Sequence, residues 1–149
     1  METKKTWKSF RYHTHGAWKQ GRRIKASVEG KPELETSSPP EFKGEPGFWT
    51  PEDLFVTALN VCIMETFLAI AEQKGLGLAA YSSSAEALLD FKDGQYRFTE
   101  ITVRPQVAVK SQEDVERARP IMESAHARCF ISNSITSSVS VLPEFRVMD

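Results

Sequence analysis

Residues 50–75 read TPEDLFVTALNVCIMETFLAIAEQKG, and this stretch decides the fold. Thr50 is a capping residue before a proline, which favours the first position of a helix, and Asp53 stands where a capping box places its carboxyl residue. Gly75 marks the end, because glycine adopts the left-handed conformation of a helix cap at little cost. The stretch predicts a helix of about 24 residues, roughly 36 Å long at 1.5 Å per residue.

This predicted helix is apolar around most of its surface from Leu54 to Ala71. Such a helix either crosses a membrane or lies buried on several sides. Asn60 and Glu65 fall in the middle of the stretch, and no flanking pattern of lysine and arginine supports insertion. We therefore expect a central, buried helix, and in so short a chain we expect a second subunit to cover part of it.

Downstream of the helix, the side chains alternate in the manner of β-strands. Residues 81–91 place Tyr81, Ala85 and Leu89 on one face and polar residues on the other, which is the period of a strand. Asp93-Gly94 is a favoured hairpin turn. Residues 96–109 then return as a second strand, with apolar positions in register at Ile101, Val103, Val107 and Val109.

A second helix is expected to begin at Ser111, with Asp114 at the capping-box position. Pro120 lies inside it and should kink it. Its inward positions are Val115, Ala118, Met122 and Ala125. After a short polar stretch, a final strand is predicted over about residues 139–147.

The chain upstream of the first helix has a different character. Residues 7–28 mix aromatic, histidine and basic residues with glycine, a pattern typical of short strands joined by turns, so a β-ribbon is expected. Residues 31–48 hold four prolines and two glycines and should form a loop or an extended arm. With no internal repeat, residues 1–149 are predicted to be one α+β domain, with two helices packed on antiparallel sheet.

The composition limits which binding partners and which cellular compartment we expect for this chain. The 149 residues include 19 basic and 20 acidic side chains, so the formal charge of −1 gives no electrostatic case for nucleic acid or an anionic membrane. The first ten residues are polar and do not resemble a secretion signal. Two cysteines do not make a disulfide scaffold, so we expect a cytoplasmic protein whose cysteines are inert, redox-active or metal-bound.

The two cysteines occupy unlike places. Cys62 lies in the middle of the first helix, where a free cysteine is ordinarily a small buried residue. Cys129 ends the second helix and precedes residues 130–133, which could begin a fresh helical turn. Amide groups at such a turn would stabilise the Cys129 thiolate.

Metal binding and simple helix capping are the alternatives for the remaining polar residues. His13, His15 and His126 could join Cys129 in a four-ligand zinc site, although this spacing occurs equally without a metal. Otherwise His126 caps or packs the second helix. The carboxylate of Glu52, in the first helical turn, is explained by the helix dipole alone.

Two motifs nevertheless resemble the OsmC/Ohr family, the cytoplasmic thiol peroxidases of bacteria. The family's first helix reads like TNPEQLF followed by small residues and a cysteine, and here TPEDLF at residues 50–55 is followed by Cys62, ten residues after Glu52. Its second motif resembles A-H-x-x-C-x-x-S-N, matched here by residues 125–133. The order of strands, helices and hairpin also agrees, so the resemblance covers nearly the whole chain and implies the OsmC-like fold.

The resemblance implies a role for each candidate site residue. Cys62 would attack the peroxide and become a sulfenic acid, and Cys129 would resolve it as a disulfide. Glu52 would hold an arginine that stabilises the Cys62 thiolate. The family places this arginine in a G-G-R turn of the ribbon, where this chain has Lys19, with Arg22 and Arg23 close behind. Arg22 is the candidate that we take forward.

An intertwined homodimer follows from the resemblance and agrees with helix geometry. Ten residues of helix separate Glu52 from Cys62 by about 15 Å along the axis, so the two can share a site only if they come from different subunits. The expected activity is reduction of organic hydroperoxides, without a cofactor, by a dithiol reductant that in the family is often a lipoyl group. The alternative is a protein on the same scaffold that binds a small hydrophobic ligand.

Overall fold

The computed structural model describes residues 3–4 and 6–148. The predicted lack of a secretion signal rests on residues 1–10, of which 1, 2 and 5 lie outside this part. The chain divides into two compact units, residues 1–52 and 53–149, which are described separately. Whether residues 1–149 behave as one domain stays a prediction.

The first unit is a three-stranded antiparallel sheet with a short 3₁₀ turn. Gly21, with φ of +54°, makes the tight turn of the predicted ribbon between the first two strands. The proline-rich stretch is mostly loop, as predicted, but it also adds a third, short strand. The elements are β1 (His15–Gln20), β2 (Arg23–Ser27), β3 (Leu34–Thr36) and the 3₁₀ helix η1 (Pro40–Phe42).

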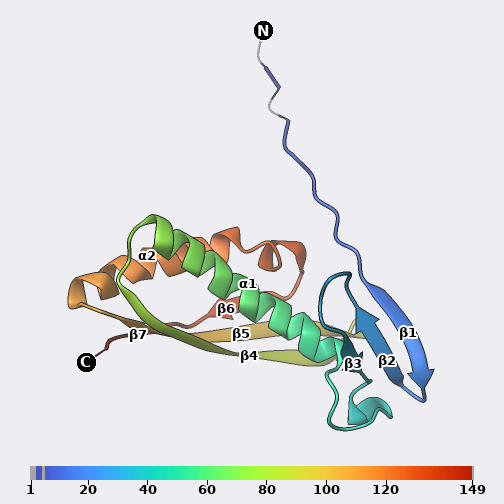
Figure 1. The fold of residues 1–149 in the computed structure, drawn as a ribbon. Helices are drawn as coiled ribbons and strands as arrows, with labels where there is room; N and C mark the ends of the chain where they lie inside the picture. The colour runs from blue at the N-terminus through green and yellow to red at the C-terminus, as the bar shows by residue number, and fades with distance from the viewer. Residues whose placement is uncertain (1–2, 5, 149) are drawn as a thin grey trace. The chain divides into compact units, whose positions relative to one another are not determined.

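The second unit packs two helices against one face of a long sheet, as Figure 1 shows. Its main strands pair in an antiparallel hairpin, which confirms the predicted α+β class. The sheet also contains parallel pairs, which the sequence did not predict. The elements are α1 (Pro51–Gln73, which starts in the first unit), β4 (Leu78–Lys92), β5 (Gln95–Val109), α2 (Gln112–Arg128), the 3₁₀ helix η2 (Ser132–Ser134), β6 (Ser138–Val141) and β7 (Glu144–Val147).

Helix α1 begins and ends where the sequence predicts. Pro51 is its first residue, and Gly75 adopts the left-handed conformation, with φ of +63°, just beyond its end. By length and composition α1 could cross a membrane, a test that the core helix of a soluble protein also passes. One face is packed into the core through Leu59, Ile63, Phe67, Ile70 and Ala71.

The hairpin and the second helix also follow the sequence. Asp93 and Gly94 both have positive φ, at 52° and 84°, as a tight hairpin turn between β4 and β5 requires. The side-chain oxygen of Ser111 accepts a hydrogen bond from the Asp114 amide at 3.2 Å and caps α2. Pro120 lies inside α2, and all four predicted inward positions are buried: Val115, Ala118, Met122 and Ala125.

The prediction of one final strand over residues 139–147 was wrong. Leu142-Pro143 separates two short strands, β6 and β7, and proline cannot donate a hydrogen bond to a sheet ladder. Both strands pair with β5 in parallel orientation. The sheet is therefore mixed, whereas the sequence predicted an antiparallel one.

Candidate active site

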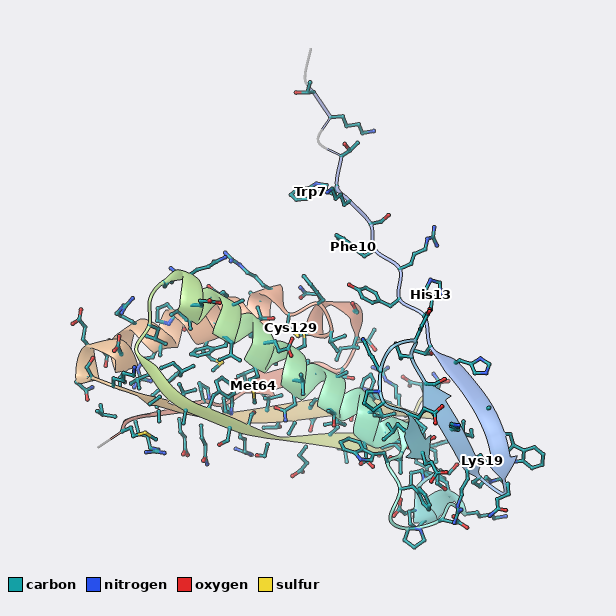
Figure 2. All side chains as sticks on the ribbon, viewed as in Figure 1. Trp7, Phe10, His13, Lys19, Met64 and Cys129 are labelled. Carbon is teal, nitrogen blue, oxygen red and sulfur yellow. The ribbon has the colours of Figure 1, made fainter. Side chains whose placement is uncertain are left out.

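The two helices bring the cysteines together by running in opposite directions. The Arg117 guanidinium, near the start of α2, donates a hydrogen bond to the carbonyl of Lys74, just past the end of α1. Twelve residues further along α2, Cys129 reaches Cys62, which lies twelve residues before Lys74 on α1, and the two thiols are in hydrogen-bond contact. Figure 2 shows Cys129 beside the middle of α1. Residues 67 positions apart in sequence thus form one site.

A tight turn after Cys129 sets the direction of the backbone amides. The Cys129 carbonyl accepts a hydrogen bond from the Asn133 amide at 3.0 Å, and the Cys129 sulfur accepts one from the Ser132 amide at 3.4 Å. The Asn133 side chain donates to the Ala127 carbonyl at 3.1 Å and ties the turn back to α2. In this conformation the amides of Phe130 and Ile131 point at Cys62 and donate to its sulfur.

These donors make Cys62 the more acidic thiol. Its partial burial alone would raise its pKa, but hydrogen bonds from the Ile131 amide, the Cys129 thiol, the Phe130 amide and Thr66 outweigh burial and hold the pKa below its ordinary value. The Thr66 hydroxyl, one helical turn along α1, donates its proton to the Cys62 carbonyl at 2.8 Å and has the smallest effect of these groups on the Cys62 pKa. The arrangement favours a Cys62 thiolate.

Cys129 has the opposite environment. It is fully buried, and burial is the main cause that raises its pKa; together with the nearby Cys62 sulfur, burial outweighs the hydrogen bonds from the Ser132 and Ile131 amides. The predicted stabilisation of the Cys129 thiolate by the turn at residues 130–133 is present, because the Ser132 and Ile131 amides lower the pKa of Cys129, but burial and the Cys62 sulfur outweigh it. The amides of Phe130 and Ile131, in the same turn, also donate to the Cys62 sulfur.

Cys62 opens onto a groove along the exposed face of α1. The groove has a volume of about 800 Å³, within the range of small-molecule sites. Most of its lining is apolar, with Leu54, Val61 and Phe130 exposed at 36%, 43% and 81%. Its remaining lining residues are Thr57, Ala58, Cys62, Glu65, Thr66, Ala69, Ile70, Gln73 and Arg128.

The other predicted site residues lie in the first unit. Glu52 occupies the first turn of α1, and one of its carboxylate oxygens is buried with no hydrogen-bond partner within residues 3–4 and 6–148. Arg22 lies in the turn between β1 and β2. Lys19 pairs with Glu35 at 3.3 Å, and Arg23 pairs with Glu45. The roles of Glu52 and Arg22 stay predictions.

The zinc alternative gains no support from the geometry. No group of three or more histidine, cysteine, aspartate or glutamate side chains is placed to hold a metal ion in the described part of the chain. His13 and His15 belong to the first unit, whereas His126 and Cys129 belong to the second. At the end of α2, the His126 carbonyl accepts a hydrogen bond from the Cys129 amide at 3.4 Å.

Sequence reasoning missed the donors that surround Cys62. The amides of Phe130 and Ile131 carry no side-chain signature, and only the predicted turn after Cys129 indicated that amides would converge there. Thr66 could have been found, because it lies four residues after Cys62 on the same helix face. Arg128, which lines the groove, was not singled out from the sequence.

The fold is α+β, and its two helices bring two free cysteines into contact beside an apolar groove. These features define a protein with a paired-thiol site. The family model described as OsmC-like protein matches residues 44–144, and the chain belongs to this family. No curated protein sequence matches the chain.

Solved structures share the fold. An OsmC-like protein of unknown function from Vibrio cholerae is 23% identical, with a TM-score of 0.84, and the match covers 91% of this chain and 100% of that one. An organic hydroperoxide resistance protein from Legionella pneumophila is 23% identical, with a TM-score of 0.67 and coverage of 95% and 100%. A putative organic hydroperoxide resistance protein from Vibrio cholerae, with captopril in one active site, is 25% identical, with a TM-score of 0.66 and 93% coverage of each chain.

Proposed function

We propose that the protein is a thiol peroxidase that reduces organic hydroperoxides through Cys62 and Cys129. The observation that carries this proposal is the asymmetry of the two touching thiols at an apolar groove: the pKa of Cys62 is lowered and that of Cys129 is raised. An acidic thiol is the better nucleophile near neutral pH, because a larger fraction of it is thiolate. The names of the two organic hydroperoxide resistance proteins agree with this chemistry.

The reaction proceeds in three balanced steps. The Cys62 thiolate attacks one oxygen of the O–O bond, so the sulfur is oxidised to a sulfenic acid and the alkoxide leaves and takes a proton to become an alcohol. The Cys129 thiol then attacks the Cys62 sulfur, which forms the disulfide and releases water. A dithiol reductant, for which we propose a lipoyl group, restores both thiols and is itself oxidised to a disulfide.

Glu52 and Arg22 complete the proposed site. An arginine held by the Glu52 carboxylate would stabilise the Cys62 thiolate and polarise the peroxide, a role suited to a rigid, always-charged fork. One buried oxygen of Glu52 has no hydrogen-bond partner within the described residues, which supports the proposal that an arginine binds there. An R22Q variant should react with peroxide more slowly while its circular dichroism spectrum is unchanged, and an unchanged rate would remove Arg22 from the mechanism.

We propose that the protein works as a homodimer in the cytoplasm. The exposed, apolar side of α1 supports the proposal that a second copy packs against it, because soluble monomers rarely expose large apolar patches. In an antiparallel pair of helices, Glu52 of one subunit could approach Cys62 of the other, which the separation of about 15 Å within one helix prevents. Sedimentation should give the mass of a dimer, and a monomer at working concentration would contradict this part of the proposal.

The activity is tested with reduced protein and one equivalent of cumene hydroperoxide. The proposal predicts rapid loss of peroxide and a Cys62–Cys129 disulfide in the mass spectrum of the digest. A C62S variant is the control and should leave the peroxide intact. Two thiols that stay reduced while the peroxide persists would reject peroxidase activity toward this substrate.

The second candidate function is binding of a small hydrophobic ligand without efficient catalysis. The size and apolar lining of the groove favour it, as does Lys19 at the position where the family carries arginine. This candidate predicts that an apolar ligand binds equally well to wild-type protein and to C62S. Turnover of cumene hydroperoxide by the wild type would reject it.

A further inference from the structure

Arg128 lies on the face of the molecule that the proposed second subunit covers. It is the last residue of α2, and it lines the groove beside Cys62 together with the exposed side of α1. In the single chain its side chain is exposed and has no hydrogen bond or ion pair with any described residue. By contrast, Arg117 on the same helix is bound by Asp114 at 2.9 Å. Arg128 is therefore a cation whose own subunit supplies no partner.

A second copy packed on this face would remove water from the Arg128 guanidinium. A charged group that loses its water destabilises an interface unless an opposite charge and hydrogen bonds replace that water. Its own subunit places one carboxylate in the groove, that of Glu65, and the two side chains are not within ion-pair distance. The proposed dimer thus requires an acidic side chain of the partner subunit beside Arg128.

The contacts between α2 and α1 define where Arg128 lies along the central helix. Cys129 contacts Cys62, and twelve residues earlier on α2 the Arg117 side chain contacts the residue twelve positions after Cys62. The two helices therefore run in opposite directions with matched rise. Arg128, one residue before Cys129, is level with Ile63.

In the proposed dimer, a carboxylate of the partner subunit reaches this level. An antiparallel pair of α1 helices that brings Glu52 of the partner subunit opposite Cys62 has its two-fold axis at Thr57, which lies midway between them and lines the groove. The level of Arg128 is then within one residue of Glu52 of the partner subunit, a rise of about 1.5 Å along the axis.

We propose that Arg128 forms an ion pair with Glu52 of the partner subunit and is thereby a positioning residue, which holds that carboxylate beside Cys62. The proposal rests on the proposed homodimeric peroxidase. A carboxylate accepts hydrogen bonds at both oxygens, so Glu52 can bind Arg128 of one subunit and Arg22 of its own at the same time. Arg128 occupies an unspecified position of the A-H-x-x-C motif, so the contact is a feature of this chain.

Glu65 is the rival acceptor on α1. It reaches Arg128 of the partner subunit only if the two-fold axis lies near residue 64, about seven residues further along the helix. That register brings the two Glu65 side chains of the dimer close together at the axis, where like charges repel. It also carries Glu52 away from Cys62 of the partner subunit. These consequences favour Glu52.

The test exchanges charges across the interface. The variants are R128E, E52R, the exchanged pair E52R/R128E and the rival exchange E65R/R128E. R104E is the control, since it makes the same charge change at an exposed position of β5. Sedimentation gives the dissociation constant of each dimer, and circular dichroism checks that each variant is folded.

We expect R128E and E52R each to raise the dissociation constant by about tenfold or more, because each places like charges opposite one another at the interface. E52R/R128E should recover most of that loss, since the cycle measures the contact between the two residues. E65R/R128E should not recover it, and R104E should resemble the wild type.

The positioning role is tested at protein concentrations at which each variant is dimeric. R128Q should then react with cumene hydroperoxide about tenfold more slowly than the wild type. R128K should recover part of the rate, because lysine keeps the charge without the two-pronged guanidinium. R104Q, as the control, should react at the wild-type rate.

An exchanged pair that fails to recover the dimer, or recovery by E65R/R128E in its place, would overturn the assignment of Glu52 as the partner of Arg128. An R128Q dimer that reacts as fast as the wild type would overturn the positioning role. A monomeric wild type, or a wild-type dimer that leaves cumene hydroperoxide intact, would instead reject the underlying homodimer or peroxidase. The failures are therefore distinguishable.

Discussion

The surroundings of Cys62 and Cys129 differ although the two thiols touch. Cys62 is partly exposed on α1, faces a groove and accepts hydrogen bonds from two backbone amides, whereas Cys129 is fully buried at the end of α2. The same turn contributes to both environments, because its Ser132 amide donates to the buried Cys129 sulfur and its Phe130 and Ile131 amides donate to Cys62. The difference distinguishes a thiol suited to attack a peroxide from one suited to react with the sulfenic acid that this attack forms.

Removal of each thiol should break this comparison most strongly. C62S should lower peroxide turnover by about a thousandfold or more, because the attacking atom is lost. C129S should still consume one equivalent of peroxide and then stall in turnover with a dithiol reductant. Stopped-flow peroxide consumption distinguishes the two variants, and equal residual activity in both would contradict the assignment of roles.

The pH dependence of the two thiols should differ in a defined order. Cys62 should be alkylated rapidly at a pH below the ordinary cysteine pKa of about 8.5, and Cys129 only above it. Peroxide reduction should therefore rise with pH and level off below that value. Iodoacetamide labelling followed by mass spectrometry reads each site separately, and coincident labelling curves would refute the predicted order.

The same shifts have opposite consequences for the stability of the reduced protein. The lowered pKa of Cys62 contributes stability above its unfolded pKa, which is lost as the pH falls through the folded pKa. The raised pKa of Cys129 contributes stability below its unfolded pKa, which is lost as the pH rises through the folded pKa. Thermal unfolding of C62S and C129S across this range should show the two trends with opposite sign.

Removal of a single amide donor sharpens the comparison further. F130P lacks the backbone N–H that donates to Cys62 and should raise the Cys62 pKa by about 1 to 2 units, since a hydrogen bond to a charged group contributes about 1.5–3 kcal/mol. F130A keeps the N–H and is the matched control for loss of the ring. An unchanged Cys62 pKa in a folded F130P protein would show that this amide is not a significant donor.

The smallest expected effect is that of the Thr66 hydroxyl. T66V should raise the Cys62 pKa by less than about one unit, because one neutral donor is lost while the amides remain. T66S retains the hydroxyl and should resemble the wild type. A larger shift in T66V than in F130P would reverse the order of the donors proposed for the thiolate.

Much of the fold could be predicted because local signals agree with the final packing. The cap at Ser111, the left-handed Gly75 and the Asp93-Gly94 turn each depend on a few neighbouring residues, and each lies where it was predicted. The parallel pairing of β6 and β7 with β5 was missed, because strand direction depends on contacts distant in sequence. Pro143 was the local signal that could have divided the final strand.

The candidate site was predictable in its side chains and not in its backbone. Cys62 and Cys129 stood out through their motifs, and the structure brings them together. The amides of Phe130 and Ile131 could not be identified, since every residue except proline carries an amide and only the folded turn directs it. The division of roles was implied by the resemblance, and the structure adds the sign of each pKa shift, which depends on those amides and on burial.

The most direct measurement of that division traps the first oxidised sulfur. The C129S and C62S variants are each treated with one equivalent of cumene hydroperoxide in the presence of dimedone, which labels sulfenic acids, and the labelled cysteine is identified by mass spectrometry. The peroxidase assignment predicts a dimedone adduct on Cys62 in C129S and almost none on Cys129 in C62S. An adduct on Cys129 in C62S, with Cys62 unlabelled in C129S, would contradict it.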